Sequence, residues 1–148
     1  MEKILRGGCL CGSVRYEYSG EPEDASYCHC DDCRRATGGP YTVGVLAQAD
    51  RLHIVSGRVK GYTTTGDSGR KITREFCPQC GSPLFTRAER YPNLVWLKAG
   101  CLDEPELIKP SCQTWTKCAV PWAYIDENLP CFPEGGPSRA DGLARAGA

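Results

Sequence analysis

Apolar and polar side chains alternate in several short stretches of this chain. At 13–18 the sequence reads Ser-Val-Arg-Tyr-Glu-Tyr, so an apolar or aromatic side chain stands at every second position. A period of two is typical of a strand with one buried face. Comparable stretches rich in β-branched and aromatic residues predict further strands at 41–46, 51–55, 59–64, 71–76, 94–97 and 122–125. The pattern therefore predicts a mainly β protein.

A helical period of 3.6 is not sustained over three turns anywhere in the sequence. The strongest helix candidate is Asp31–Thr37, which has room for one or two turns before Gly38-Gly39. With 148 residues, no internal repeat and no linker, the chain suits one domain that buries its own core. We expect this domain to span residues 1–134. Residues 135–148 lack large apolar side chains apart from Leu143 and are predicted to form a flexible tail.

Charge and hydropathy argue against several classes of partner. Lys plus Arg and Asp plus Glu number 18 each, so the formal net charge is zero and nothing favours nucleic acid. No apolar run approaches the roughly 20 residues that a membrane span needs. Residues 1–6 carry no signal-peptide pattern, and we expect a cytoplasmic protein. No feature of the sequence indicates an oligomeric state.

Cysteine is unusually frequent, with eleven in 148 residues. Disulfides would explain such a count in an exported protein, but the number is odd and no export signal is seen. Seven of the cysteines also lie in C-x-C or C-x-x-C spacings, which bridge only with strain but share a metal ion easily. The sequence therefore predicts metal ligation. The seven fall into three clusters: Cys9 and Cys11; Cys28, Cys30 and Cys33; and Cys77 and Cys80.

The spacing suggests how the seven ligands divide between ions. Zinc takes four ligands in a tetrahedron, and each two-cysteine cluster supplies half of such a site. The middle cluster supplies three thiolates from six residues, which leaves one position for water or substrate, as in catalytic zinc sites. The favoured division is a closed site of four cysteines and an open site of three, with two zinc ions per chain. Spacing alone also allows Cys77 and Cys80 to complete the middle cluster.

Two other interpretations of the cysteines stay open at this point. All of the zinc could be structural, as in small zinc-ribbon proteins. Thiolates also suit iron–sulfur clusters. His29 lies between two of the ligands, and because adjacent residues of an extended chain point apart, we expect it beside the site rather than on the metal. His53 is expected to be partly buried, and the three tryptophans and four remaining cysteines are expected to be core residues: Trp96, Trp115, Trp122, Cys101, Cys112, Cys118 and Cys131.

These motifs resemble those of the glutathione-dependent formaldehyde-activating enzyme family, which is grouped with centromere protein V. The resemblance lies in the order C-x-C-G, then Y-C-H-C-x-x-C, then F-C-x-x-C-G, and it covers about residues 5–134. Smaller signals agree, among them Val55-Ser56-Gly57 and Pro121-Trp122. The resemblance implies a single zinc-stabilised β-tent domain of short antiparallel strands. It also implies the division into a structural zinc at Cys9, Cys11, Cys77 and Cys80 and a catalytic zinc at Cys28, Cys30 and Cys33.

The resemblance further implies a carbon–sulfur lyase. Its substrates would be a thiol such as glutathione and a small aldehyde such as formaldehyde, joined as in S-(hydroxymethyl)glutathione synthesis. Zinc deprotonates a bound thiol, which suits this chemistry better than hydrolysis when three thiolates already offset the metal charge. The chain departs from the family where a histidine often follows the segment equivalent to Lys109-Pro110, since Ser111-Cys112-Gln113 stands there. The alternative to an enzyme is a non-catalytic, zinc-stabilised interaction module.

Overall fold

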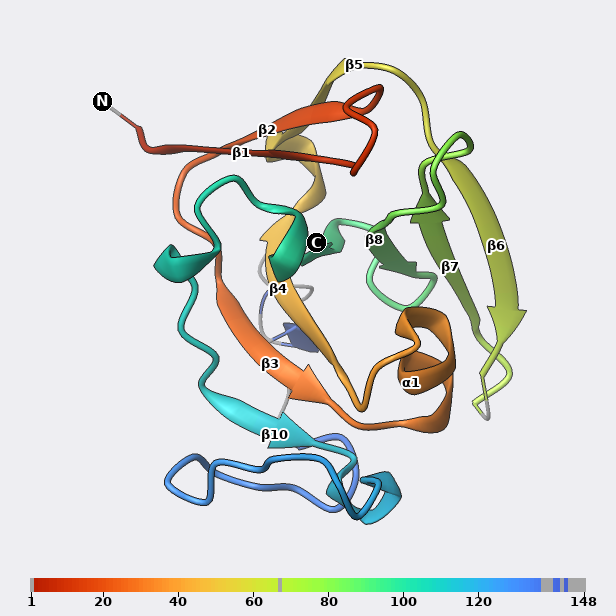
Figure 1. Cartoon of the computed structure of the whole chain (residues 1–148), viewed down its shortest axis with the longest axis vertical. Coiled ribbons are helices and arrows are strands. Elements are labelled where there is room, and N and C mark those ends of the chain that lie inside the picture. The colour runs from red at the N-terminus through yellow and green to blue at the C-terminus, as the bar shows by residue number, and fades with distance from the viewer. Residues whose placement is uncertain (1, 67, 137–139, 142, 144–148) are drawn as a thin grey trace.

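The fold is built from two β-sheets of unequal size (Figure 1). A computed structural model describes residues 2–66, 68–136, 140, 141 and 143. The small sheet has the strand order β1-β2-β5, and the large sheet has the order β10-β3-β4-β9-β8-β7-β6. Neighbouring strands are antiparallel except β10 and β3, which are parallel. The strands are β1 (Ile4–Gly8), β2 (Arg15–Ser19), β3 (Asp24–Cys28), β4 (Thr42–Gln48), β5 (Leu52–Ser56), β6 (Lys60–Thr65), β7 (Lys71–Phe76), β8 (Pro83–Ala88), β9 (Leu94–Lys98) and β10 (Cys112–Thr114).

The main core lies between the small sheet and one face of the large sheet. Tyr16 and Tyr18 of β2 are fully buried, and the ring of Tyr16 meets the edge of Phe85 from β8 at a centroid distance of 4.9 Å. Every second side chain of β4 and β9 faces this core, and Val45 and Leu97 point into it. Aromatic rings from both sheets and the aliphatic side chains around them bury apolar surface between the sheets. The sheets are therefore packed layers of one domain.

The helical segments are short and lie at turns. The α-helix α1 (Asp31–Thr37) lies between β3 and β4, and residues 140, 141 and 143 are also helical. Its N-cap is Cys30, whose sulfur accepts from the Cys33 N–H, and its C-cap is Gly38 at φ 77°. Glycine adopts this left-handed conformation without strain, so the helix ends where the sequence predicted. Four 3₁₀ turns complete the list: η1 (Ala49–Arg51), η2 (Ala99–Cys101), η3 (Pro105–Leu107) and η4 (Thr116–Cys118).

The mainly β class is confirmed, and so is the helix Asp31–Thr37. The expected strands from 13–18 to 94–97 overlap observed strands, while β1, β3, β8 and β10 were not predicted. The strand predicted at 122–125 is wrong, because that run forms turn and loop with no pairing partner. Trp122 was expected in the core and is 70% exposed. His53, expected partly buried, and Cys131, expected in the core, are exposed.

The predicted tail lies partly outside the described residues, which omit 137–139, 142 and 144–148. Of the remainder, Ala140 is buried against Leu46 and Leu94, on the face of the large sheet opposite the main core. The Tyr91 hydroxyl donates to the Asp141 carboxylate at 2.6 Å. The division at residue 134 stays a prediction. No helix in the described ranges is long and apolar enough to cross a bilayer.

Candidate metal centres

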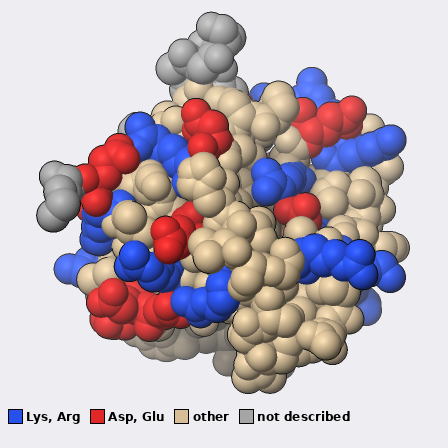
Figure 2. Space-filling view, turned by 90° about the horizontal axis from the view of Figure 1, so that it is seen from above, with Lys and Arg blue, Asp and Glu red and all other residues tan. Residues whose placement is uncertain are grey.

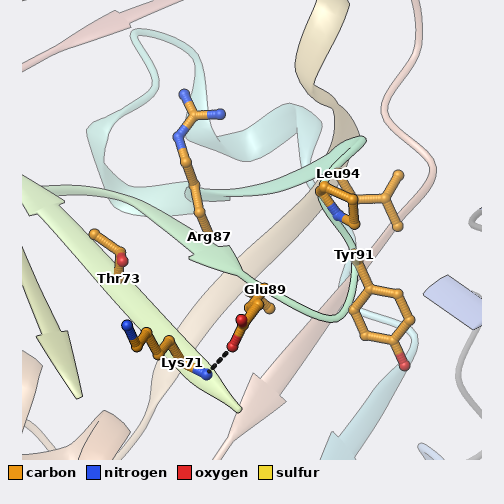
Figure 3. A pocket seen from close by; sticks show the side chains of 8 residues that line it. Lys71, Thr73, Arg87, Glu89, Tyr91 and Leu94 are labelled. Atoms are coloured by element: carbon orange, nitrogen blue, oxygen red, sulfur yellow. Dashed lines mark hydrogen bonds between the residues drawn. The ribbon is translucent and has the colours of Figure 1, made fainter. Parts of the chain in front are cut away.

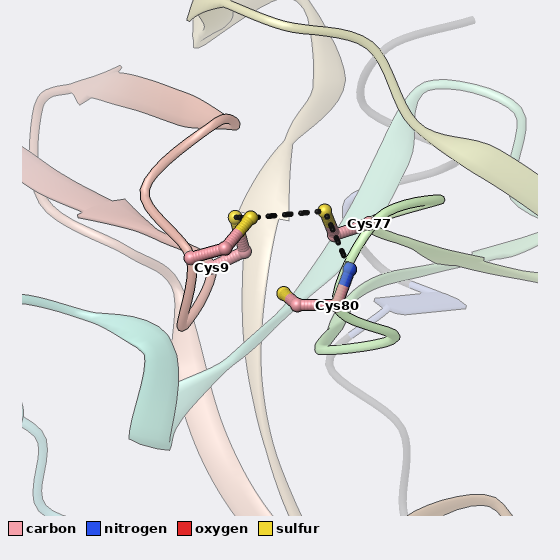
Figure 4. A group of neighbouring side chains, drawn as sticks. Cys9, Cys77 and Cys80 are labelled. Carbon is pink, nitrogen blue, oxygen red and sulfur yellow. Dashed lines mark hydrogen bonds between the residues drawn. The ribbon is translucent and has the colours of Figure 1, made fainter.

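Four cysteines meet where one hairpin of each sheet turns. Cys9 and Cys11 lie in the turn between β1 and β2, and Cys77 and Cys80 lie in the turn between β7 and β8. Their sulfur atoms lie within 4.8 Å of one another. Figure 4 shows the labelled side chains converging from the two turns. The group therefore joins the small sheet to the large one, and its two halves are 66 residues apart in sequence.

The two turns are built alike. In each, the N–H of the first cysteine donates to a carbonyl five residues later, from Cys9 to Val14 at 3.1 Å and from Cys77 to Ser82 at 3.0 Å. In each, a glycine N–H then closes back on the carbonyl of that cysteine, and these glycines have φ values of 80° and 77°. A side chain rarely adopts such angles, so glycine is required after each cysteine motif. The two glycines are Gly12 and Gly81.

The sulfur geometry of this group fits a tetrahedral metal ion. Four sulfurs at the usual zinc distance of about 2.3 Å lie about 3.8 Å from one another. The sulfurs of Cys9 and Cys11 are 3.6 Å apart, and those of Cys11 and Cys77 are 3.8 Å apart. The donor set is all thiolate, which suits zinc and also iron. The four residues are therefore spaced to ligate one ion without rearrangement.

Hydrogen bonds prepare two of these thiols to lose their protons. The pKa of Cys80 is lowered to about 5, chiefly because the Ser82 hydroxyl lies 3.2 Å from its sulfur. Burial acts to raise the pKa of Cys9, but donation from the Val14 N–H and contact with the Ser13 hydroxyl bring it to about 7. Metal ligation requires thiolates, so these groups lower the cost of binding a cation.

The second group is local and combines a strand end with a helix start. Cys28 is the last residue of β3, Cys30 is the N-cap of α1, and Cys33 lies in the first turn of that helix. All three are partly buried, and their sulfurs lie within 4.8 Å of one another. Among the described residues, no further His, Cys, Asp or Glu side chain joins this group. The arrangement offers three thiolate ligands and one position not claimed by such a side chain.

The three thiols perturb one another strongly. The pKa of Cys33 is lowered because the thiols of Cys28 and Cys30 donate to its sulfur, and the pKa of Cys28 is raised for the same reason. The buried hydroxyl of Thr42 also donates to Cys33. Lys98 lies within electrostatic range of all three sulfurs, and burial is the main cause that lowers its pKa. The three sulfurs therefore share their protons through hydrogen bonds, and a bound cation would displace those protons.

His29 lies beside the three-cysteine group, as the sequence predicted, and outside the set of candidate ligands. It is fully buried, and its Nε2 is 2.7 Å from the Gln113 side-chain oxygen of β10. Its ring meets the edge of the Tyr41 ring at a centroid distance of 5.2 Å. Gln113 itself is buried, so this pair ties the loop after β3 to β10. The histidine thereby supports the backbone that carries Cys28 and Cys30.

Other surface features do not coincide with the cysteines. A pocket of about 320 Å³ lies beside β7, β8 and the loop after β8, and is lined by residues including Lys71, Arg87 and Tyr91 (Figure 3). It contains no cysteine, and the backbone N–H of Lys71 bonds the Glu89 carboxylate across it at 2.8 Å. Acidic and basic side chains are interspersed on the face seen in Figure 2. Neither feature carries chemistry comparable to the two thiol groups.

Sequence reasoning identified the cysteines but missed the groups that surround them. Ser13 directly follows the first C-x-C-G motif and Ser82 directly follows the last C-x-x-C-G motif, so their positions were a usable signal. Thr42 and Lys98 had no such signal, because they reach the middle cluster only through strand pairing. The Cys101 thiol donates to the Pro83 carbonyl at 3.1 Å and belongs to neither group.

Comparison with known proteins agrees with this geometry. The family model for the glutathione-dependent formaldehyde-activating enzyme matches residues 4–118. A curated protein of Halomonas elongata, named "Putative glutathione-dependent formaldehyde-activating enzyme", is 33% identical over 110 residues. That match covers 68% of this chain and 66% of the relative, just under two thirds of its length.

A solved structure shares the fold. The crystal structure of a Rhodobacter sphaeroides protein superposes with a TM-score of 0.56 at 24% identity, covering 71% of this chain and 96% of that one. At this level of identity the likeness shows the fold alone. The arrangement of sheets described above therefore occurs in an experimentally determined protein.

Proposed function

Since the chain belongs to the glutathione-dependent formaldehyde-activating enzyme family, we propose that it is a zinc-dependent enzyme of carbon–sulfur bond chemistry. Its substrates would be a thiol of the glutathione type and a small aldehyde such as formaldehyde. In the reaction, the thiol sulfur forms a bond to the carbonyl carbon and the thiol proton ends on the carbonyl oxygen. The reverse direction breaks the same bond and releases both partners, so atoms balance without any oxidant or reductant.

The observation that carries this proposal is the three-cysteine group. Cys28, Cys30 and Cys33 converge without a fourth His, Cys, Asp or Glu among the described residues. Three protein ligands with a remaining position distinguish catalytic zinc sites from structural ones. A zinc ion held there would supply a substrate thiolate at neutral pH. The proposed catalytic ligands are therefore these three cysteines.

The surrounding residues of the chain have supporting tasks in this proposal. The Thr42 hydroxyl and the Cys33 N–H, which donate to sulfurs of the group, hold two thiolates in position. The buried His29–Gln113 pair fixes the loop and keeps water from that side. Lys98 adds positive charge beside the sulfurs and so offsets the repulsion among them. None of these residues needs to transfer a proton in the scheme.

The four-cysteine group takes the structural role in the proposal. Each of its ligands is used, and the group joins turns from both sheets. A metal there ties β1–β2 to β7–β8 and stabilises the folded state directly. Two zinc ions per chain follow from this assignment. None of the eleven cysteines is in a disulfide. We propose the cytoplasm, where thiols stay reduced, as the location.

The decisive experiment combines metal analysis with a direct assay of exchange. Protein purified without oxygen is expected to contain two zinc ions. Nuclear magnetic resonance then follows the exchange of formaldehyde with its glutathione adduct, and the protein is expected to raise the rate above that of the uncatalysed reaction. Cys131→Ser changes an exposed thiol outside both groups and serves as the matched control. Two bound ions without rate enhancement would favour the interaction module instead.

A further inference from the structure

One face of the large sheet gathers positive charge beside the three-cysteine group. Directly opposed residues of neighbouring strands share a face. Arg74 of β7 opposes Thr86 of β8, and Thr86 opposes Trp96 of β9. Lys98 lies two residues beyond Trp96 and therefore on the same face. On the neighbouring strand β4, Gly44 opposes Lys98. Thr42 lies two residues before Gly44 on the same face and opposes Cys28 of β3.

The cations on this face have no acidic partner among the described residues. Neither Arg74 nor Lys98 takes part in an ion pair of the described structure. The Nη1 atom of Arg74 donates to the Thr64 hydroxyl at 3.4 Å. The Arg74 Nε and the Thr86 hydroxyl oxygen are both buried without a hydrogen-bond partner in the described structure. Buried donors of this kind are costly unless a ligand satisfies them.

The neighbouring arginine on the opposite face provides a contrast. Arg87 opposes Thr73, one residue along from the Arg74–Thr86 pair, so its side chain leaves the sheet on the other side. Its Nε lies 2.7 Å from a Glu75 carboxylate oxygen. The same hairpin therefore pairs the arginine on one face with a carboxylate and leaves the arginine on the other face without one.

The surroundings of the two cations indicate which of them is available to a ligand. Lys98 lies within electrostatic range of the three sulfurs and of Arg74. Its charge therefore acts on the thiolates of the group. The guanidinium of Arg74 does not lose its proton in proteins, and its Nε is buried without a hydrogen-bond partner in the described structure. Arg74 is therefore the donor that an anionic group of the ligand can satisfy.

We propose that Arg74, together with the Thr86 hydroxyl, binds a carboxylate of the substrate thiol. The site then selects thiols that carry a carboxylate, such as glutathione, over neutral thiols. A guanidinium can bind a carboxylate through two parallel N–H bonds, which gives orientation as well as affinity. The indole of Trp96 lies 3.2 Å from the place of a Cβ on Gly44, the residue that opposes Lys98, and adds an apolar surface to the same face. The identity of the ligand as a thiol rests on the proposed function, whereas the contact between Arg74 and a carboxylate does not depend on it.

The test compares ligands with and without a carboxylate, measured by titration calorimetry on the zinc-loaded protein. Arg74→Gln is expected to weaken glutathione binding about 10- to 100-fold and to change 2-mercaptoethanol binding less than about threefold. Arg74→Lys keeps the charge and is expected to restore part of the affinity. Arg87→Gln, on the opposite face of the same hairpin, is the matched control and is expected to bind both thiols like wild type. Circular dichroism and zinc content check that each variant folds.

A third ligand separates failure of this inference from failure of the proposed function. S-methylglutathione keeps both carboxylates but has no free thiol, so its binding does not depend on thiolate formation. Loss of its binding in Arg74→Gln, with binding retained in Arg87→Gln, supports the carboxylate site even if no thiol binds. Three results would overturn the carboxylate site. In the first, Arg74→Gln weakens the binding of glutathione and of 2-mercaptoethanol equally. In the others, Arg74→Gln leaves the binding of S-methylglutathione unchanged, or the wild-type protein does not bind S-methylglutathione.

Discussion

The two cysteine groups differ most in how far apart in sequence their members lie. The three-cysteine group spans 28–33, around the start of one helix. The four-cysteine group joins turns of two sheets across 66 residues. Closing a long loop costs more chain entropy than closing a short one, so the distant group adds a constraint that the unfolded chain lacks. The comparison suggests that one site maintains the fold while the other is free to exchange a ligand.

Removing the long-range group should have the largest effect. Cys77→Ser replaces a fully buried ligand and is expected to lower the melting temperature by about 10 °C or more, because a structural zinc contributes its binding energy to folding. Calorimetry gives the melting temperature, and elemental analysis should show one zinc ion per chain instead of two. Cys131→Ser is the control, expected to keep both ions. An unchanged melting temperature would remove the structural role.

Disabling the local group should reduce activity more than stability. Cys30→Ser removes one of three ligands, while serine remains a good N-cap for α1. We expect thiol-dependent exchange to fall at least about 100-fold and the melting temperature to change by less than about 4 °C. The same assays used on Cys77→Ser make the comparison direct. If both variants lose stability alike, the two groups do not differ in role.

Acidity should reveal the hydrogen bonds that prepare the distant group. The pKa of Cys80 is about 5 in the folded state against an ordinary value of 9.0, chiefly because of Ser82. Between these two pH values the folded state holds a Cys80 thiolate while the unfolded chain binds a proton. The contribution of Cys80 to stability is therefore complete above about pH 9 and is lost as pH falls through about 5. In metal-free protein, Ser82→Ala is expected to lower the free energy of unfolding more at pH 9 than at pH 5.

Measurement of that difference by urea unfolding at several pH values tests the assignment. Part of the loss in unfolding free energy is expected to be the same at every pH, because the Ser82 hydroxyl also accepts from the Leu10 N–H at 3.0 Å. A difference between the variants that does not change with pH would show that Ser82 acts only through this bond. Ser68→Ala, a hydroxyl on the β6–β7 turn remote from both groups, provides the baseline.

The smallest effects concern the glycines that follow each motif. Gly38 and Gly81 both have φ 77° and open space around the position of a Cβ. Alanine should therefore cost about 1–2 kcal/mol of backbone strain at either position. Only Gly81→Ala should also weaken zinc retention against a chelator, since Gly81 closes the turn of Cys77 and Cys80. Equal zinc retention in both variants would show that the cysteine turn tolerates the strain.

Local signals were sufficient for several features of this protein. The cysteine spacings, the helix Asp31–Thr37 and its stop at Gly38 were all predicted, because each depends on residues only a few positions apart. The alternating strands, such as β2 and β7, were predicted for the same reason. The family resemblance rested on these short motifs as well, and the comparisons confirm it.

Tertiary structure decided the features that depend on distant partners. The short strands β3 and β10 exist because they pair with each other and, for β3, with β4. The more apolar run 122–125 has no strand partner among the described residues and forms turn and loop. Sheet pairing likewise placed Lys98 and Arg74 near the middle cluster and brought the two outer cysteine clusters together. The sequence by itself thus determined which residues can bind a metal, through spacing that is local. Only the packing of two sheets decided which of them share a site, because that choice depends on contacts between residues far apart in the chain.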